Sequence, residues 1–264
     1  GKSSKAIKFL TEEYLSSANI KAACEKINLF NQRVENDYLE KFKIYCLIKN
    51  DQKEEAQLIL DLLVEKGFKD NFFENKINYL LGTDVNKSTK IIDNNLFNFY
   101  LSYVTNDTFD YKPTENTDPY IWKYLSSANL IEVNNFEDED VILTYEQAAA
   151  QNSFDNKEIF KIYLKMNFNF NQLVNANEIY KTLPNYKARA LIYQSILLTD
   201  DIEKKINLAF LLKDLFMKDK LFDVYTDELS DILKSIDKNK IPENYVELVE
   251  QNFNKDLNSK IKFD

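Results

Sequence analysis

The 264-residue chain contains no His. Without an imidazole it cannot form a Ser–His–Asp triad, a His-ligated zinc site or a carboxylate–histidine di-iron site. Its paired carboxylates lie where helices are expected to begin, and there they favour the helix dipole and cap free N–H groups. We therefore predict no catalytic residue, no metal site and no cofactor, in a chain that is not an enzyme. The carboxylate pairs are Glu12-Glu13, Glu54-Glu55, Glu137–Asp140 and Asp200-Asp201.

Glycine and proline are also scarce, with 3 Gly and 4 Pro. Phosphate-binding loops, dinucleotide-binding turns and tight hairpins need glycine for positive φ or close backbone approach. Helices joined by short polar turns need much less of it, so the sequence predicts an all-α fold. No apolar run approaches the roughly 18 residues of a membrane span, which predicts no direct membrane insertion. The net charge of −9, with Lys scattered among the acids, predicts no nucleic-acid partner.

Apolar residues do recur at helical spacing along the whole chain, and 44% of the residues are hydrophobic. Asp51 with Glu54, and Asp200 with Glu203, read as N-caps with capping-box partners. Asp70 opens a further predicted helix that Gly82 closes. Helices are predicted at 20–30, 39–46, 51–67, 70–82, 92–103, 119–129, 140–151, 155–166, 170–182, 184–198, 201–218, 221–236 and 243–253.

The stretch 106–118 breaks this pattern, because it holds Pro113 and several Thr, Asn and Asp residues. It is the longest predicted loop and the best candidate boundary. The prediction is an N-terminal helical lobe over 1–105 and a C-terminal lobe over 119–264. One continuous solenoid is the alternative.

Two short sequences occur twice in the same order. The hexapeptide Tyr14–Asn19 recurs at Tyr124–Asn129, and Phe42–Tyr45 recurs at Phe160–Tyr163. A two-fold duplication would produce this echo, since helical-repeat proteins commonly contain internal repeats. Coincidence in a biased composition remains the other explanation.

In pattern, the chain resembles the tetratricopeptide-like α-solenoid superfamily over most of its length. Ala176 with Tyr180 matches the small-then-aromatic pair of a repeat's second helix, Leu183-Pro184 follows where such a repeat would end, and Ala56 with Leu60 is a weaker match. The full consensus and its period of about 34 residues are missing. The chain also resembles helical-repeat proteins of bacteria, alphaproteobacteria in particular, to which we attach no activity. The superfamily resemblance implies stacked antiparallel helical hairpins in a right-handed superhelix.

The only two cysteines, Cys24 and Cys46, fall on the apolar faces of consecutive predicted helices. Antiparallel neighbours could bring them to disulfide distance, which would imply an oxidising compartment. Two buried thiols are the equally weighted alternative. The chain begins at Gly1 without Met, which indicates that a tag or an N-terminal segment such as a signal peptide has been removed. Together these features favour the periplasm, with the cytoplasm as the alternative.

Arg33 and Arg189 stand out because the chain has 32 Lys and only these 2 Arg. Arg189 lies about one helical turn from both Tyr186 and Tyr193. We interpret it as a partly buried residue that holds a carboxylate or helix-end carbonyls, in preference to a ligand-binding residue. Trp122, the only Trp, either anchors the segment after the loop or lines a concave face.

The resulting hypothesis is a non-enzymatic helical-repeat scaffold that binds a protein or peptide along a concave or end surface. One alternative is a binding protein for a small or apolar ligand held between helix layers. Another is a helical accessory domain of a larger envelope enzyme, which would resemble the superhelical region of some lytic transglycosylases. The sequence carries no signal for oligomeric state.

Overall fold

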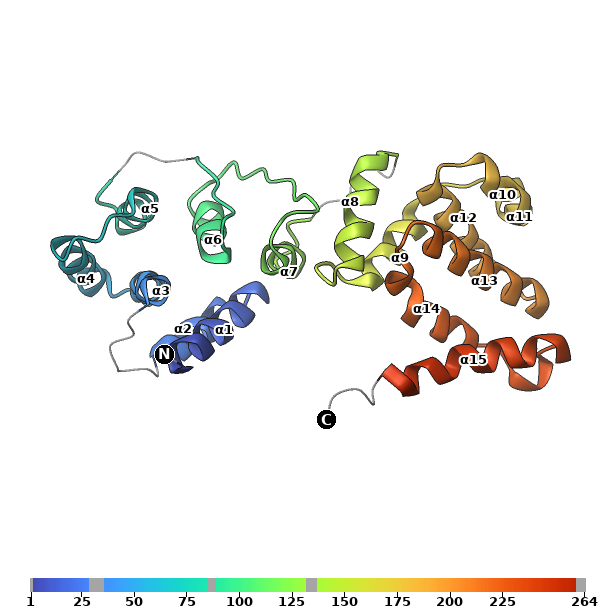
Figure 1. Ribbon diagram of the computed structural model, residues 1–264. Helices are drawn as coiled ribbons and strands as arrows, with labels where there is room; N and C mark the ends of the chain where they lie inside the picture. The colour runs from blue at the N-terminus through green and yellow to red at the C-terminus, as the bar shows by residue number, and fades with distance from the viewer. Residues whose placement is uncertain (1, 29–35, 85–88, 132–136, 260–264) are drawn as a thin grey trace. The chain divides into compact units, whose positions relative to one another are not determined.

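The computed structural model describes residues 2–28, 36–84, 89–131 and 137–259, with side chains from 4 to 252. All regular structure in these residues is helical, which confirms the all-α prediction (Figure 1). The chain divides into two compact units, unit 1 (1–132) and unit 2 (133–264).

Unit 1 contains seven helices in its described residues, and most helices that follow one another along the chain pack together. The most extensive contact is between α1 and α2, followed by that between α3 and α4. Helix α1 also packs against α6 and α7, which brings the two ends of the unit together. The helices are α1 (Lys2–Ser16), α2 (Ile20–Asn28), α3 (Asp37–Lys49), α4 (Lys53–Glu65), α5 (Asn71–Leu81), α6 (Leu96–Val104) and α7 (Pro119–Ser127).

Unit 2 is built around α12, which packs against α13, α9, α10 and α8. Helices α13 and α14 form a further close pair, and α14 also contacts α8, α9 and α15. The helices are α8 (Glu139–Ala150), α9 (Asn156–Lys165), α10 (Phe170–Val174), α11 (Ala176–Ile179), α12 (Asn185–Leu198), α13 (Ile202–Lys218), α14 (Phe222–Lys234) and α15 (Glu243–Ser259). Two 3-10 turns occur at Tyr180–Thr182 and Lys238–Lys240.

The segment 106–118, predicted to separate two lobes, lies inside unit 1. It joins α6 to α7, and α7 packs back on α1, where Lys123 Nζ lies 2.8 Å from Glu13 Oε2. Trp122 is buried and donates from Nε1 to the Thr114 carbonyl oxygen at 3.2 Å. These contacts hold the loop and α7 in the first compact unit.

Several predicted helix ends are wrong because neighbouring turns use the capping residues. Asp51 does not cap α4; it has a φ of 63° and belongs to the turn that ends α3, where the Gln52 N–H donates to the Leu47 carbonyl oxygen. The N-cap of α13 is Asp201 in place of Asp200. Asp70 does cap α5, and Gly82 closes it at a φ of 82°, as predicted.

Two predicted helices are shorter or broken in the structure. The helix predicted at 92–103 begins only at Leu96, because the Asn95 side chain accepts from the Asn98 N–H and caps it there. The helix predicted at 170–182 divides at Asn175, whose side chain donates to the Asn171 carbonyl oxygen and ends α10. Ala176 and Tyr180, the pair behind the repeat resemblance, therefore lie in α11 and in the 3-10 turn that follows.

Candidate functional site

The most unusual group of polar side chains in the described residues surrounds Arg189 in unit 2. Nearly the whole circumference of α12 is buried, with Tyr186, Leu191 and Ile196 among its buried residues. A side chain in the middle of such a helix cannot reach water. Arg189 is accordingly 0% exposed.

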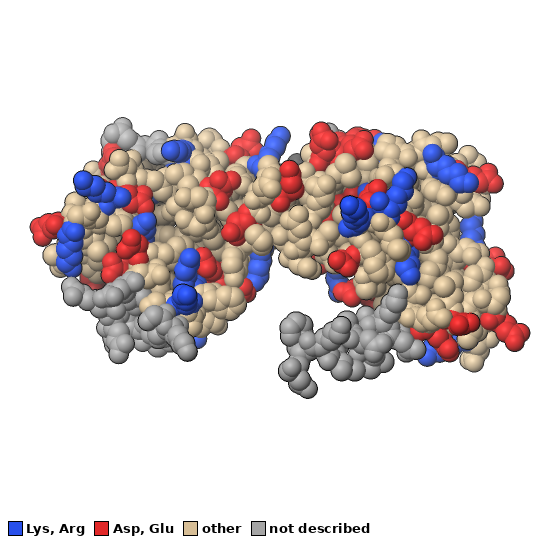
Figure 2. Space-filling view, in the orientation of Figure 1, with Lys and Arg blue, Asp and Glu red and all other residues tan. Residues whose placement is uncertain are grey.

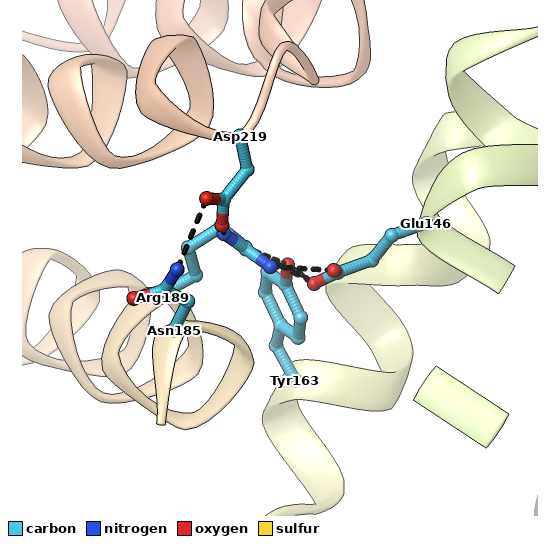
Figure 3. Close-up of polar contacts among 5 residues, drawn as sticks. All are labelled: Glu146, Tyr163, Asn185, Arg189 and Asp219. Atoms are coloured by element: carbon cyan, nitrogen blue, oxygen red, sulfur yellow. Dashed lines mark hydrogen bonds and ion pairs between the residues drawn. The ribbon is translucent and has the colours of Figure 1, made fainter. Parts of the chain in front are cut away.

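Arg189 is surrounded by groups from three other elements (Figure 3). Its Nη2 lies 2.5 Å from Glu146 Oε2, and its Nε donates to Glu146 Oε1 at 3.1 Å and to the Tyr163 hydroxyl at 3.2 Å. Nη1 donates to Asp219, the residue that ends α13. The guanidinium carbon also lies 5.5 Å from the centre of the Phe216 ring.

The carboxylates are tied in turn by other donors. The Tyr163 hydroxyl donates to Glu146, and Asn185 Nδ2 donates to Asp219 Oδ1 at 3.0 Å. We name Arg189, Glu146, Tyr163, Asp219 and Asn185 the arginine cluster. It connects α8, α9, α12 and the end of α13.

Burial and charge act in opposite directions on these groups. Burial opposes the charge of the Arg189 guanidinium, but Tyr163, Glu146 and Asp219 raise its pKa above the ordinary value. Burial and the Glu146 carboxylate raise the pKa of the Tyr163 hydroxyl well above 10. The fully buried pair of Arg189 and Glu146 is neutral as a whole, while Asp219, whose side chain is 23% exposed, keeps some contact with water.

The polar groups of the arginine cluster are directed at one another, so the cluster holds helices in position. The guanidinium fork donates to both carboxylates, and the Tyr163 proton is directed at Glu146. Charge-assisted bonds of this kind fix geometry strongly, because Arg189 or Glu146 would be left buried without its partner. The arginine cluster is therefore a clamp between helices.

The two tyrosines grouped with Arg189 from the sequence bind elsewhere. The Tyr186 hydroxyl donates to the Glu137 carbonyl oxygen at 3.0 Å, and the Tyr193 hydroxyl donates to Glu228 Oε1 at 2.8 Å. Arg33 lies outside the described residues. Trp122 takes the anchoring position described above, in unit 1.

The sequence reasoning missed Glu146, Tyr163 and Asp219. Glu146 gave one usable signal, because it lies beside Tyr145 and just before Ala148 and Ala149, all of them buried on α8. An acid so placed needs a buried cation, and only two Arg were available. Asp219 gave no such signal, since an acid after a helix is ordinary.

In unit 1, the Cys24 and Cys46 sulfur atoms lie 2.10 Å apart, at disulfide distance, with the Cα atoms 5.4 Å apart. Both residues are buried and connect α2 to α3. Of the two open interpretations, the geometry is that of the covalent staple.

In the described residues no three His, Cys, Asp or Glu side chains are grouped as a metal site would need. No helix there has both the length and the apolar character required to cross a membrane.

Fold and site together define an all-α protein of packed helix pairs, with a buried arginine clamp in one unit and a cysteine pair in the other. Comparisons with protein-family models, curated proteins and solved structures find no match for this chain.

Proposed function

We propose that the chain is a non-enzymatic helical-repeat scaffold that binds another protein or a peptide. In this proposal its hairpins stack in a right-handed superhelix of the tetratricopeptide-like type. The close packing of chain neighbours α1–α2, α3–α4, α12–α13 and α13–α14 supports the hairpin part of the proposal. Such hairpins bury one face against the next pair and leave other faces for partners.

One observation carries the binding proposal: large apolar side chains are exposed on the surfaces of both units. Leu58 and Leu62 on α4, Phe170 on α10, and Leu197 and Leu198 at the end of α12 are exposed. Each costs free energy in water that a partner could recover by covering it. The charged groups of the arginine cluster, by contrast, are bound to one another.

The charge distribution favours a protein partner over nucleic acid. The chain carries a net charge of −9, and on the face shown in Figure 2 the Lys side chains are interspersed with Asp and Glu. Nucleic-acid binding relies on clustered cations that displace counterions from phosphates.

We propose an oxidising compartment, the bacterial periplasm, as the location of the protein, with the cytoplasm as the alternative. The cysteine pair at disulfide distance is compatible with this location.

The experiment that tests the scaffold is partner identification followed by reconstitution. The tagged chain is crosslinked in the source cells, candidate partners are identified by mass spectrometry, and each is purified and titrated against the chain by calorimetry. A stoichiometric complex with a purified protein is the expected result. If no crosslinked protein binds the purified chain, the proposal is contradicted.

A further inference from the structure

Helix α4 combines an exposed apolar pair with an acidic border. Leu58 and Leu62 are 59% and 43% exposed, although α4 already buries Ala56 and Leu60 against its own unit. At 3.6 residues per turn, Leu58 and Leu62 lie on one face, one turn apart. Leu58 and Leu62 therefore form a short apolar stripe that the unit leaves open.

The residues that share this face are acidic. On a helical projection, Glu54, Asp61 and Glu65 lie on one side of the leucine pair and Glu55 lies on the other. All four are exposed. Lys53 lies on the opposite side of the helix, and Lys66 follows its last turn.

Local hydrogen bonds hold two of these acids without removing their charge. Gln57 Nε2 donates to Asp61 Oδ1 at 2.8 Å, and Gln52 Nε2 donates to Glu55 Oε2 at 3.2 Å. An amide donor is neutral, so neither hydrogen bond places a cation beside the acid. The leucine pair thus lies in a negative field.

We propose that the α4 face, defined as Leu58 and Leu62 with Glu54, Glu55, Asp61 and Glu65, binds a basic amphipathic helix of a partner protein. The partner lays its own apolar stripe on the two leucines, while Lys or Arg side chains on its borders reach the four acids. A second copy of this chain fits poorly, because two α4 faces would bring acid against acid. An anionic lipid surface is repelled for the same reason. This inference rests on the proposed scaffold function and specifies the chemistry of its partner.

The position of α4 suits such a partner. It packs closely on α3 and lies at the edge of unit 1 in Figure 1. An added helix there would extend the series of packed helices by one, in the way that a further hairpin would.

The test uses two synthetic helical peptides of about 18 residues, long enough to form helix on the protein. Both have leucines at the same helical spacing; one has Lys on the borders and the other has Glu. Binding to the full chain is followed by fluorescence anisotropy. We expect the Lys peptide to bind at least about tenfold more tightly than the Glu peptide, and added salt to weaken its binding.

Attraction of any cationic peptide to an acidic protein must be separated from docking on α4. The double variant Leu58→Glu with Leu62→Glu is compared with Leu197→Glu with Leu198→Glu, whose leucines are 49% and 68% exposed in unit 2. We expect the α4 variant to lose about tenfold or more in affinity for the Lys peptide, and the unit 2 variant to bind as the native chain does. Equal losses, or no loss in the α4 variant, would overturn the inference.

A second pair of variants isolates the charge. Glu54→Lys with Glu65→Lys changes the net charge as much as Glu178→Lys with Asp227→Lys, which alters exposed acids of unit 2. The Glu54→Lys, Glu65→Lys variant should bind the Lys peptide more weakly and the Glu peptide more tightly than the native chain does. An equal effect of the unit 2 variant would contradict a specific site. Circular dichroism verifies that every variant keeps the native helix content.

The inference and the scaffold function can fail separately. A natural partner that binds the native chain and the Leu58→Glu, Leu62→Glu variant equally overturns the α4 site and leaves the scaffold intact. A chain without any reconstituted partner overturns the scaffold, whatever the peptides do.

Discussion

The same tetrapeptide lies in the core of both units, but its tyrosine has a neutral partner in one unit and charged partners in the other. Phe42–Tyr45 lies on α3 of unit 1, and Phe160–Tyr163 lies on α9 of unit 2. In both copies the Phe, Ile and Tyr side chains are buried. The tyrosine of unit 1 shares a hydrogen bond of 2.8 Å with the Tyr100 hydroxyl, whereas the tyrosine of unit 2 binds Glu146 and Arg189.

The two cores are accordingly held together by different means. Unit 1 combines aromatic contacts, such as the 4.9 Å between the ring centres of Phe42 and Phe97, with the cysteine pair. Unit 2 has comparable ring contacts around Phe160 but adds the arginine cluster. The lesson is that a short sequence determines which of its side chains are buried, while residues far along the chain determine whether a buried tyrosine meets a neutral or a charged partner.

Removing the buried guanidinium of Arg189 should produce the largest effect on stability. Arg189→Ala leaves the Glu146 carboxyl group buried and without its guanidinium, so we expect about 3–5 kcal/mol less stability of unit 2. Hydrogen exchange followed by mass spectrometry should show faster exchange in unit 2 and little change in unit 1.

The control for Arg189→Ala is Arg189→Lys, which keeps the charge and loses the planar fork. If this variant still folds with a smaller loss, the charge and the fork contribute separately. A loss below about 1 kcal/mol for Arg189→Ala would contradict a buried clamp.

Unit 1 should respond instead to its cysteines. Opening the crosslink between Cys24 and Cys46, which are 22 residues apart, should cost roughly 3 kcal/mol through the larger entropy of the unfolded chain. Cys24→Ala with Cys46→Ala and reduction of the native chain should give similar losses in urea unfolding. Thiol counting on denatured, unreduced protein should come first. Two free thiols would contradict the crosslink and the argument for an oxidising compartment.

The two equivalent tyrosines allow a matched comparison. Tyr163→Phe removes a buried hydroxyl bonded to charged groups and should cost about 2 kcal/mol, while Tyr45→Phe, with a neutral partner, should cost about 1 kcal/mol. Equal costs would indicate that the charged setting of Tyr163 adds nothing.

The pH dependence of the same variants has a defined sign. Burial, together with Glu146, raises the pKa of Tyr163 in the folded chain well above that of an unfolded tyrosine, about 10. Its contribution is complete below about pH 10 and is lost as the pH rises towards the folded value, because the unfolded chain then releases the proton first. Tyr163→Phe should therefore lose less stability than the native chain on going from pH 9 to about pH 11, as measured by urea unfolding.

The sequence carried the fold class and the single residue around which the unit 2 cluster forms, and the reasons are local. Scarce glycine and 3.6-residue periodicity act within one helix, so they predicted helices, and the rarity of Arg singled out Arg189. Glu146 and Asp219 are 43 and 30 residues from Arg189, and no local pattern joins such residues. The division at 132 depends on α7 packing on α1, which is again a long-range contact.

The repeated hexapeptide shows how the next residues override an identical sequence. In the first copy Asn19 accepts from the Ala22 N–H and begins α2, so Ala18 takes the left-handed position with a φ of 56°. In the second copy no helix follows at once, and Asn129 takes that position with a φ of 53°. The hydrogen bond that ends the helix therefore shifts by one residue. In the first copy the Asn19 N–H donates to the Tyr14 carbonyl oxygen, and in the second the Leu130 N–H donates to the Leu125 carbonyl oxygen.

This shift predicts opposite signs for one substitution at equivalent positions. Ala18 pays the left-handed penalty that glycine avoids, so Ala18→Gly should stabilise unit 1 by about 0.5–1 kcal/mol. Ala128 has a φ of −89°, where glycine only adds freedom to the unfolded chain, so Ala128→Gly should destabilise by a similar amount, about 0.5–1 kcal/mol. Urea unfolding of the two variants beside the native chain measures both. The same sign at both positions would mean that the two copies end their helices alike, which would contradict the one-residue shift.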